Sequence, residues 1–172
     1  SNTNGKSNSA FGHKSLTSNT TGEYNSAFGD LALEDNSTAD WNTAVGYGVL
    51  KNNTTGQGNT AIGNRSMETN TTTSSHTAVG YQALRSNSSG TYNTAVGYQA
   101  LSTNNSGQRN AATGTWALRN NISGSDNTAV GYGTLQLNTT ASYNTAHGSS
   151  SLYSNLTAVS YTHLTLPTIL LV

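Results

Sequence analysis

The sequence predicts an all-β fold, a repetitive β-solenoid or β-roll with one 17-residue coil per repeat. Three observations lead to this prediction: a strict repeat, a composition poor in helix formers, and a short β-branched and aromatic run in every unit. Charged residues make up 8% and hydrophobic residues 33% of the 172 residues, against about 25% charged residues in typical soluble domains. Asn, Thr, Ser and Gly fill the difference, and all four are poor helix formers.

Nine alanines mark the repeat, because they recur with a strict 17-residue period. They are Ala10, Ala27, Ala44, Ala61, Ala78, Ala95, Ala112, Ala129 and Ala146. A glycine stands two places after each alanine, and Leu or Met stands six places after it. A fixed period without insertions indicates that each unit is one structural step stacked on the next. Residues 1–7 match the end of a preceding unit, so we expect the array to begin earlier than this sequence does.

Each unit is expected to contain two short strands and two turns. The run Thr94–Tyr98 reads T-A-V-G-Y, which carries the β-branched and aromatic residues typical of strands. The run Asn53–Gly56 reads N-T-T-G, which is turn chemistry because Asn tolerates and Gly favours a positive φ. With strands about 4.8 Å apart, nine stacked coils would form a rod about 43 Å long.

The predicted core is thin. Each unit offers Ala, Val, Leu and one Tyr, with the small Ala and Gly columns allowing the backbones of neighbouring coils to approach closely. The structural core is expected at Ala44, Gly46, Leu50, Ala78, Gly80, Leu84, Ala95, Gly97, Leu101, Ala129, Gly131 and Leu135. Burial worth ~25 cal/mol per Å² is small beside ~1.5 kcal/mol of entropy per ordered residue. We therefore expect parallel copies of the chain to associate with their repeats in register.

Three polar columns predict ladders along the rod. Asparagines two places before the alanines would hydrogen-bond to the copies above and below; they are Asn8, Asn25, Asn42, Asn59, Asn93, Asn110, Asn127 and Asn144, with His76 in the remaining place. Thr43, Thr60, Thr77 and Thr94 would form hydroxyl pairs. Glu34, Lys51, Glu68 and Arg85 alternate in charge, although exposed ion pairs contribute only ~0–1 kcal/mol each.

The repeated segments resemble the N-S-x-A-x-G units of trimeric autotransporter adhesin heads and the longer repeats of phage tail-fibre proteins. The matching segments are Asn8–Gly12, Asn25–Gly29, Asn42–Gly46, Asn59–Gly63, Asn93–Gly97 and Asn127–Gly131. The resemblance extends over residues 1–158 and implies a left-handed β-roll assembled as a parallel homotrimer. The adhesin unit is shorter, so the additional residues here are expected to lengthen a turn.

The resemblance also implies a function: a non-catalytic rod or stalk of an extracellular adhesin or viral tail fibre, on a cell surface or virion, that mediates surface attachment. The expected partner is the chain itself, and a host-surface glycan or protein would be bound by regions outside this sequence. The formal net charge of zero offers no footprint for nucleic acid. The apolar run Ile169–Val172 is too short to span a bilayer.

The repeat pattern ends after Ala158, so the sequence divides into a repeat array over residues 1–158 and a tail over residues 159–172. The segment Val159–Thr168 is similar to a translation of the transposase adapter used in sequencing libraries, which implies that the tail is not native. The alternative is a genuine closing strand that Pro167 and the last four residues cap.

Every full unit carries an N-x-[ST] motif at one phase of the repeat. The asparagines are Asn19, Asn36, Asn53, Asn70, Asn87, Asn104, Asn121, Asn138 and Asn155. One interpretation is a glycan on each repeat, which would make the chain an N-glycosylated extracellular fibril protein. The other, which we favour, is an asparagine that forms the turn next to a supporting hydroxyl group. Asn52 and Asn64 carry the same motif out of phase.

No catalytic, cofactor-binding or metal-binding residues are predicted, and we do not expect an enzyme. His13, His76 and His147 stand in different columns, so they would not converge on a metal or a substrate. The acids Glu34, Asp35 and Asp40 lack the G-G-x-G-x-D pattern of calcium-binding repeats. With no cysteine, disulfides and thiolate sites are excluded. A β-helical lyase would need acids and bases clustered in one groove.

Two aromatic columns have two interpretations. Tyr47, Tyr81, Tyr98 and Tyr132 form one column, and Tyr24, Trp41, Tyr92 and Tyr143 form the other. Exposed rings could stack on sugars or on a partner surface. We favour packing of one column in the core or between chains, because the core needs the area.

Overall fold

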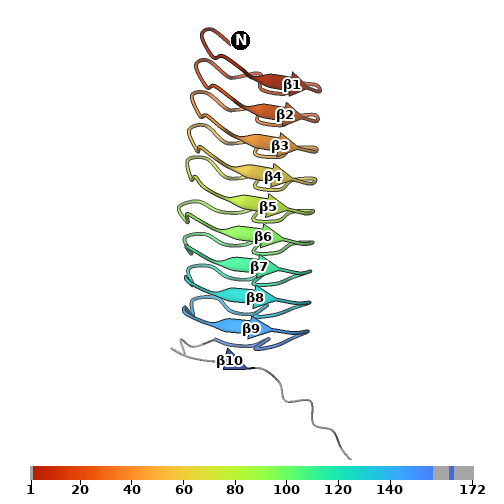
Figure 1. Ribbon diagram of the computed structural model, residues 1–172, viewed down its shortest axis with the longest axis vertical. Helices are drawn as coiled ribbons and strands as arrows, with labels where there is room; N and C mark the ends of the chain where they lie inside the picture. Colours follow the sequence, from red (N-terminus) through yellow and green to blue (C-terminus); the bar gives the residue numbers. More distant parts are fainter. Residues whose placement is uncertain (1, 157–162, 165–172) are drawn as a thin grey trace, which may run out of the picture.

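The chain winds into stacked coils that each add one strand to a single parallel sheet, as the computed structural model of residues 2–156 and 163–164 shows (Figure 1). In this described part of the chain, ten strands follow one another in sequence order without a crossover. They are β1 (Ser9–Phe11), β2 (Ser26–Phe28), β3 (Thr43–Val45), β4 (Thr60–Ile62), β5 (Thr77–Val79), β6 (Thr94–Val96), β7 (Ala111–Thr113), β8 (Thr128–Val130), β9 (Thr145–His147) and β10 (His163–Leu164). The predicted all-β solenoid is confirmed.

The register of the sheet is the sequence repeat. Between β5 and β6, Ala78 pairs with Ala95 and Val79 with Val96, and the same 17-residue offset holds from β1 to β9. Ala95 is therefore stacked on Ala78, as the repeat predicts. A one-residue slip would turn the alanines outward, so their burial fixes this register.

Each coil contains one strand rather than the two that the sequence predicted. The returning half of the coil is a series of turns, because two of its columns adopt a positive φ, as at Gln82 (53°) and Leu84 (47°). Its backbone groups still bond to the next coil: the amide of Leu84 donates to the oxygen of Ala100 at 3.0 Å. The coil therefore has a regular ladder on both sides, but only one side has strand conformation.

The glycine column after each strand is required by backbone conformation and by space. Gly97 has a φ of 134°, which residues other than glycine rarely adopt. A Cβ atom on Gly97 would lie only 2.5 Å from the oxygen of Gly114 in the next coil. Successive coils therefore approach closely at this corner, as expected from the sequence.

The core consists of two small columns and one large column. In the coils of β2 to β8, the middle alanine of the strand, the Leu or Met of the turn and the residue just before that Leu or Met are buried, among them Ala95, Ala100 and Leu101. Of the predicted core positions, Ala44, Leu50, Ala78, Leu84, Ala95, Leu101, Ala129 and Leu135 are completely buried, whereas Gly46, Gly80, Gly97 and Gly131 are half-buried.

The strand valines do not belong to the core, which corrects the sequence-based interpretation. Side chains of a strand alternate between its two faces. Since Ala44 points inward, its neighbours Thr43 and Val45 must point outward, and Val45 is 37% exposed. The column just before the leucines, which includes Ala83 and Ala100, takes the place in the core that the sequence predicts for the strand valines.

β10 pairs with β9 through His163 with Thr145 and Leu164 with Ala146. Its register is shifted by one place, because it follows β9 by 163 − 145 = 18 positions rather than by one repeat. Apart from this two-residue strand, the predicted tail 159–172 and the end of the array at residue 158 lie outside the described residues. Within the described part of the chain, no helix is long and apolar enough to cross a membrane.

Candidate functional site

The asparagines of the N-x-[ST] motifs form a hydrogen-bonded ladder, here named the turn asparagine column: Asn19, Asn36, Asn53, Asn70, Asn87, Asn104, Asn121 and Asn138. In the regular coils, each amide nitrogen donates to the amide oxygen one coil earlier and to a main-chain oxygen three residues later. Asn121 Nδ2, for example, donates to Asn104 Oδ1 at 2.8 Å and to Gly124 O at 2.9 Å. The column thus ties each turn to itself and to its neighbour.

The eight members of this column are buried, with at most 1% of the surface of each exposed. The ninth predicted position, Asn155, is half-buried, and its amide donates to Asn144 Oδ1 at 3.0 Å. A Cβ atom on Gly124 would lie 2.5 Å from Asn121 Oδ1 and 2.9 Å from Asn138 Nδ2. The site is therefore fully occupied by protein atoms, and the turn-forming interpretation explains why asparagine recurs there.

A second ladder precedes the strands. This pre-strand asparagine column consists of Asn8, Asn25, Asn42, Asn59, His76, Asn93, Asn110, Asn127 and Asn144. Asn110 Oδ1, for example, accepts the main-chain N–H of Asn127 at 3.0 Å, and Asn110 Nδ2 donates to Gly124 O at 2.8 Å. Each side chain thus replaces backbone pairing where the strand begins, and buried backbone groups are satisfied. The ladder expected from the sequence is present.

One coil departs from both ladders. His76 takes the place of a pre-strand asparagine, and its Nδ1 accepts the main-chain N–H of Asn93 at 3.2 Å. Since a neutral imidazole has one acceptor nitrogen, Nε2 carries the proton. Nε2 lies 3.1 Å from the hydroxyl oxygen of Thr73. Burial lowers the pKa of His76 to about 4, so the ring is neutral at neutral pH.

The outer face of the sheet carries two columns. The threonines expected to form hydroxyl pairs lie there, half-buried or exposed, but in the described structure no hydrogen bond joins Thr43, Thr60, Thr77 or Thr94 through their hydroxyl groups. Beside them runs the apolar outer column: Phe11, Phe28, Val45, Ile62, Val79, Val96 and Val130. Its exposure reaches 75% at Phe11 and 44% at Phe28. The outer face of the sheet therefore carries a row of apolar side chains that are exposed or half-buried.

Both aromatic columns lie on the surface, with tyrosines between 40% and 66% exposed. Packing of one column in the core is therefore wrong, whereas packing between chains stays a prediction. The rings stack on each other instead: Tyr81 and Tyr98 at 5.1 Å between centroids, and Tyr24 and Trp41 at 6.5 Å. Trp116 was not predicted to join them, because it stands one place out of the column. Its positive φ of 61° and its contacts place it between Tyr98 and Tyr132.

The charged groups pair locally. Glu34 lies 3.4 Å from Lys14 and 3.6 Å from Lys51, and Glu68 lies 2.8 Å from Arg85. In the predicted charge column, Glu34 therefore pairs with Lys51 and Glu68 with Arg85. Asp35 is exposed and apart from these pairs, and Asp40 accepts the main-chain N–H of Glu23 at 2.7 Å.

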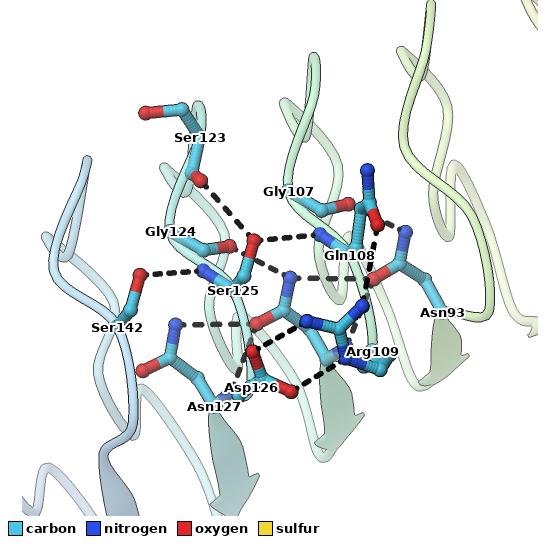
Figure 2. Close-up of polar contacts among 11 residues, drawn as sticks. Asn93, Gly107, Gln108, Arg109, Ser123, Gly124, Ser125, Asp126, Asn127 and Ser142 are labelled. Carbon is cyan, nitrogen blue, oxygen red and sulfur yellow. Dashed lines mark hydrogen bonds and ion pairs between the residues drawn. The ribbon is translucent and has the colours of Figure 1, made fainter.

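Arg109 and Asp126 form a bidentate ion pair (Figure 2). Arg109 Nε donates to Asp126 Oδ1 at 2.7 Å, and Arg109 Nη2 donates to Asp126 Oδ2 at 2.9 Å. The hydrogen bonds from Arg109 lower the pKa of the Asp126 carboxyl group. Because both side chains are on the surface, solvent screens the pair and its contribution to stability is small.

Comparison with protein-family models, with curated proteins and with solved structures found no match to the chain. The function therefore has to be argued from geometry. His13 and His147 are exposed in other columns than His76. Among the described residues, no three His, Cys, Asp or Glu side chains gather as a metal site would require. What the structure does bring together is amide ladders inside and apolar and aromatic columns outside.

Proposed function

We propose that this chain is a rod segment of an extracellular adhesin or viral tail fibre that holds an attachment region away from a cell or virion surface. The observation that carries this proposal is the unbroken sheet, in which the strands from β1 to β9 follow one another at a single 17-residue offset. Such a stack is elongated, because each repeat contacts only its neighbours along one axis. It can therefore hold a region at one end at a fixed distance from the other end.

The rod has no catalytic role in this proposal. Most of its buried polar side chains belong to the two asparagine columns, and its histidines lie in separate columns. Its acids Glu34 and Glu68 are held in ion pairs on the surface. These features favour a scaffold over a site that handles protons or a nucleophile.

The apolar outer column supports self-association. An apolar row along a sheet is unusual on a soluble monomer. Here the row is unbroken from Phe11 to Val96 and is interrupted by Thr113, and Phe28 and Ile62 in it are 44% and 39% exposed. Parallel copies of the same chain would match this row residue for residue, because every coil has the same rise. A trimer is the assembly that the resemblance to adhesin heads and tail fibres implies.

The assembly is testable by sedimentation equilibrium on the whole chain. We expect the mass of three chains for the wild type, and a monomer for the double variant Val79→Asp/Val96→Asp, whose changes lie on the outer sheet face. The matched control is Thr55→Asp/Thr72→Asp, which adds the same charges at exposed turn positions and should remain a trimer. A monomeric wild type, or a trimer that tolerates the first double variant, would refute self-association through the sheet.

The rod role itself is testable by electron microscopy of the full-length natural protein. We expect this segment to appear as a straight, thin rod between other regions, and deletion of whole 17-residue units to shorten it in steps. A compact particle in which unit deletion leaves the dimensions unchanged would contradict the proposal. The glycosylated fibril interpretation is disfavoured because its acceptor asparagines are buried.

A further inference from the structure

The turn asparagine column combines an acceptor motif for N-linked glycans with complete burial. Its eight members, from Asn19 to Asn138, are buried, and each is followed two places later by Ser or Thr. In sequence, each one is therefore an acceptor for N-linked glycans. In structure, each is an internal hydrogen-bond donor. These two properties belong to the same nitrogen atom.

The Nδ2 nitrogen has no unused N–H group and no empty space around it. Asn104 Nδ2 donates to Asn87 Oδ1 at 2.9 Å and to Gly107 O at 2.9 Å, so both of its N–H groups are used. Linkage to a sugar would replace one of them. A single Cβ atom on Gly107 would already lie 2.4 Å from Asn104 Oδ1 and 2.7 Å from Asn121 Nδ2. A whole sugar ring therefore cannot be accommodated between the coils.

N-glycan transfer in a secretory pathway acts on chains that are still unfolded, when these asparagines are accessible. A modified asparagine could then no longer enter the coil, and its neighbours in the column would lose an acceptor or a donor inside the core. We propose that the solenoid forms only in chains that fold without meeting N-glycan transfer, and that the native folding compartment of this protein lacks that machinery.

The chain offers a way to remove the acceptor motifs without touching the ladder. The hydroxyl groups that complete the motifs are on the surface, exposed or half-buried, and within the described structure they make no hydrogen bond. They belong to Thr21, Thr38, Thr55, Thr72, Ser89, Ser106, Ser123 and Thr140. One place earlier, the hydroxyl groups of Thr20, Ser37, Thr54 and Ser88 are structural instead, since each donates to a main-chain oxygen of the next coil. Thr54 Oγ1, for example, donates to Thr71 O at 3.0 Å.

The experiment compares the full chain made in two ways: in the bacterial cytosol, and with a secretion signal in a eukaryotic cell that transfers N-glycans. The variant replaces the eight hydroxyl residues with Val (for Thr) or Ala (for Ser) and adds Thr157→Val and Asn52→Ser, which remove two further motifs. It keeps the motif of the exposed Asn64 as its one acceptor. A third arm treats wild-type secreting cells with an inhibitor of N-glycan transfer.

Intact mass reports the glycans and resistance to protease reports the fold. We expect the wild-type secretory product to carry sugar on column asparagines and to be cleaved at least about tenfold faster than the bacterial product. The variant and the inhibitor-treated wild type should both regain the resistance of the bacterial product.

Three results would overturn the proposal. One is a secreted wild-type chain that carries glycans on the column and is as resistant as the bacterial product. Another is a secreted wild-type chain that emerges unmodified and folded without the inhibitor. The third is an inhibitor-treated chain that protease cleaves as fast as the untreated secreted chain. This result would show that the misfolding has a cause other than glycans.

Discussion

His76 Nε2 lies 3.1 Å from Thr73 Oγ1, and these two residues depart from the repeat together. Thr73 stands where the other described coils have Gly or Ala, and His76 stands where they have Asn. The Thr73 hydroxyl accepts from Asn87 Nδ2 at 2.8 Å and donates to Asn70 Oδ1. It therefore bridges the turn asparagine column at the step where Asn70 and Asn87 do not bond directly. Thr73, which His76 contacts, thus keeps the turn asparagine column continuous through this coil.

The first prediction is acid sensitivity at this coil. The pKa of His76 is about 4 in the folded chain against 6.5 for a free histidine, so the unfolded chain binds the proton more readily. Stability is therefore full above pH 6.5 and falls as the pH drops toward 4, by about 3 kcal/mol for a shift of this size. Structurally, a proton on Nδ1 would face the N–H of Asn93.

Denaturant unfolding at pH 7 and pH 4.5 measures this loss. The double variant Thr73→Gly/His76→Asn, which restores the regular repeat, should lose much less stability over that range, whereas His147→Asn at an exposed position should behave like the wild type. Equal losses in the wild type and the double variant would show that His76 does not carry the effect.

The second prediction is energetic coupling between Thr73 and His76. Each single variant, Thr73→Gly or His76→Asn, leaves one polar group in the core without its partner, so each should destabilise the fold. The double variant should be more stable than the sum of the single effects by about 1 kcal/mol, as for residues in one network. Unfolding of all four proteins at pH 7 measures the coupling. Simple additivity would mean that the two residues act independently.

The third prediction concerns backbone conformation. Gly58 and Ser75 occupy the same column with φ of 63° and 64°, and a Cβ atom on Gly58 would meet nothing within 4 Å. Gly58→Ala should therefore destabilise the fold by about 1 kcal/mol through the backbone alone. Ser75→Gly should stabilise it by up to about 1 kcal/mol. Thermal unfolding of both variants checks the pair, and the same sign of change for both would contradict this explanation.

The fourth prediction tests which strand side chain points inward. Ala95 is completely buried, whereas its neighbour Val96 lies on the outer face. Ala95→Val should overfill the core and cost about 1–3 kcal/mol. Val96→Thr should change stability much less, since Thr113 occupies the same column one coil later. Chemical denaturation ranks the two, and the reverse ranking would mean that the strand is turned over.

Much of the fold could be predicted because the repeat has no insertions. Stacking with a 17-residue period follows from the Ala and Gly columns alone, and Ala78 on Ala95 is the register observed. The inward side of the strand was also available from the sequence. Once Ala is placed inside, strand alternation requires Val outside. The number of hydrophobic residues in each unit predicts, by contrast, that both lie in the core.

The rest could not be predicted from residue types. Leu84 and eight counterparts, Leu or Met, have a positive φ. Their residue types give no reason to expect this conformation, so the sequence predicts a strand in the returning half of the coil. The N-x-[ST] motif is ambiguous in a different way. The same Asn and hydroxyl residue serve a turn or a glycan, and only the burial of Asn53 and its counterparts separates the two.

Rise per repeat is the central claim, and pulsed electron paramagnetic resonance between two spin labels measures it most directly. Labels at Ser26 and Thr128, both on the outer sheet face, stand six coils apart since (128 − 26)/17 = 6, which corresponds to about 29 Å at about 4.8 Å per coil. Labels at Ser26 and Thr145, seven coils apart, should lie about 5 Å farther from each other. Labelled chains diluted with unlabelled ones exclude distances between copies. Distances that grow by one constant step per repeat unit are predicted, and distances that do not grow with coil number would contradict the stacked solenoid.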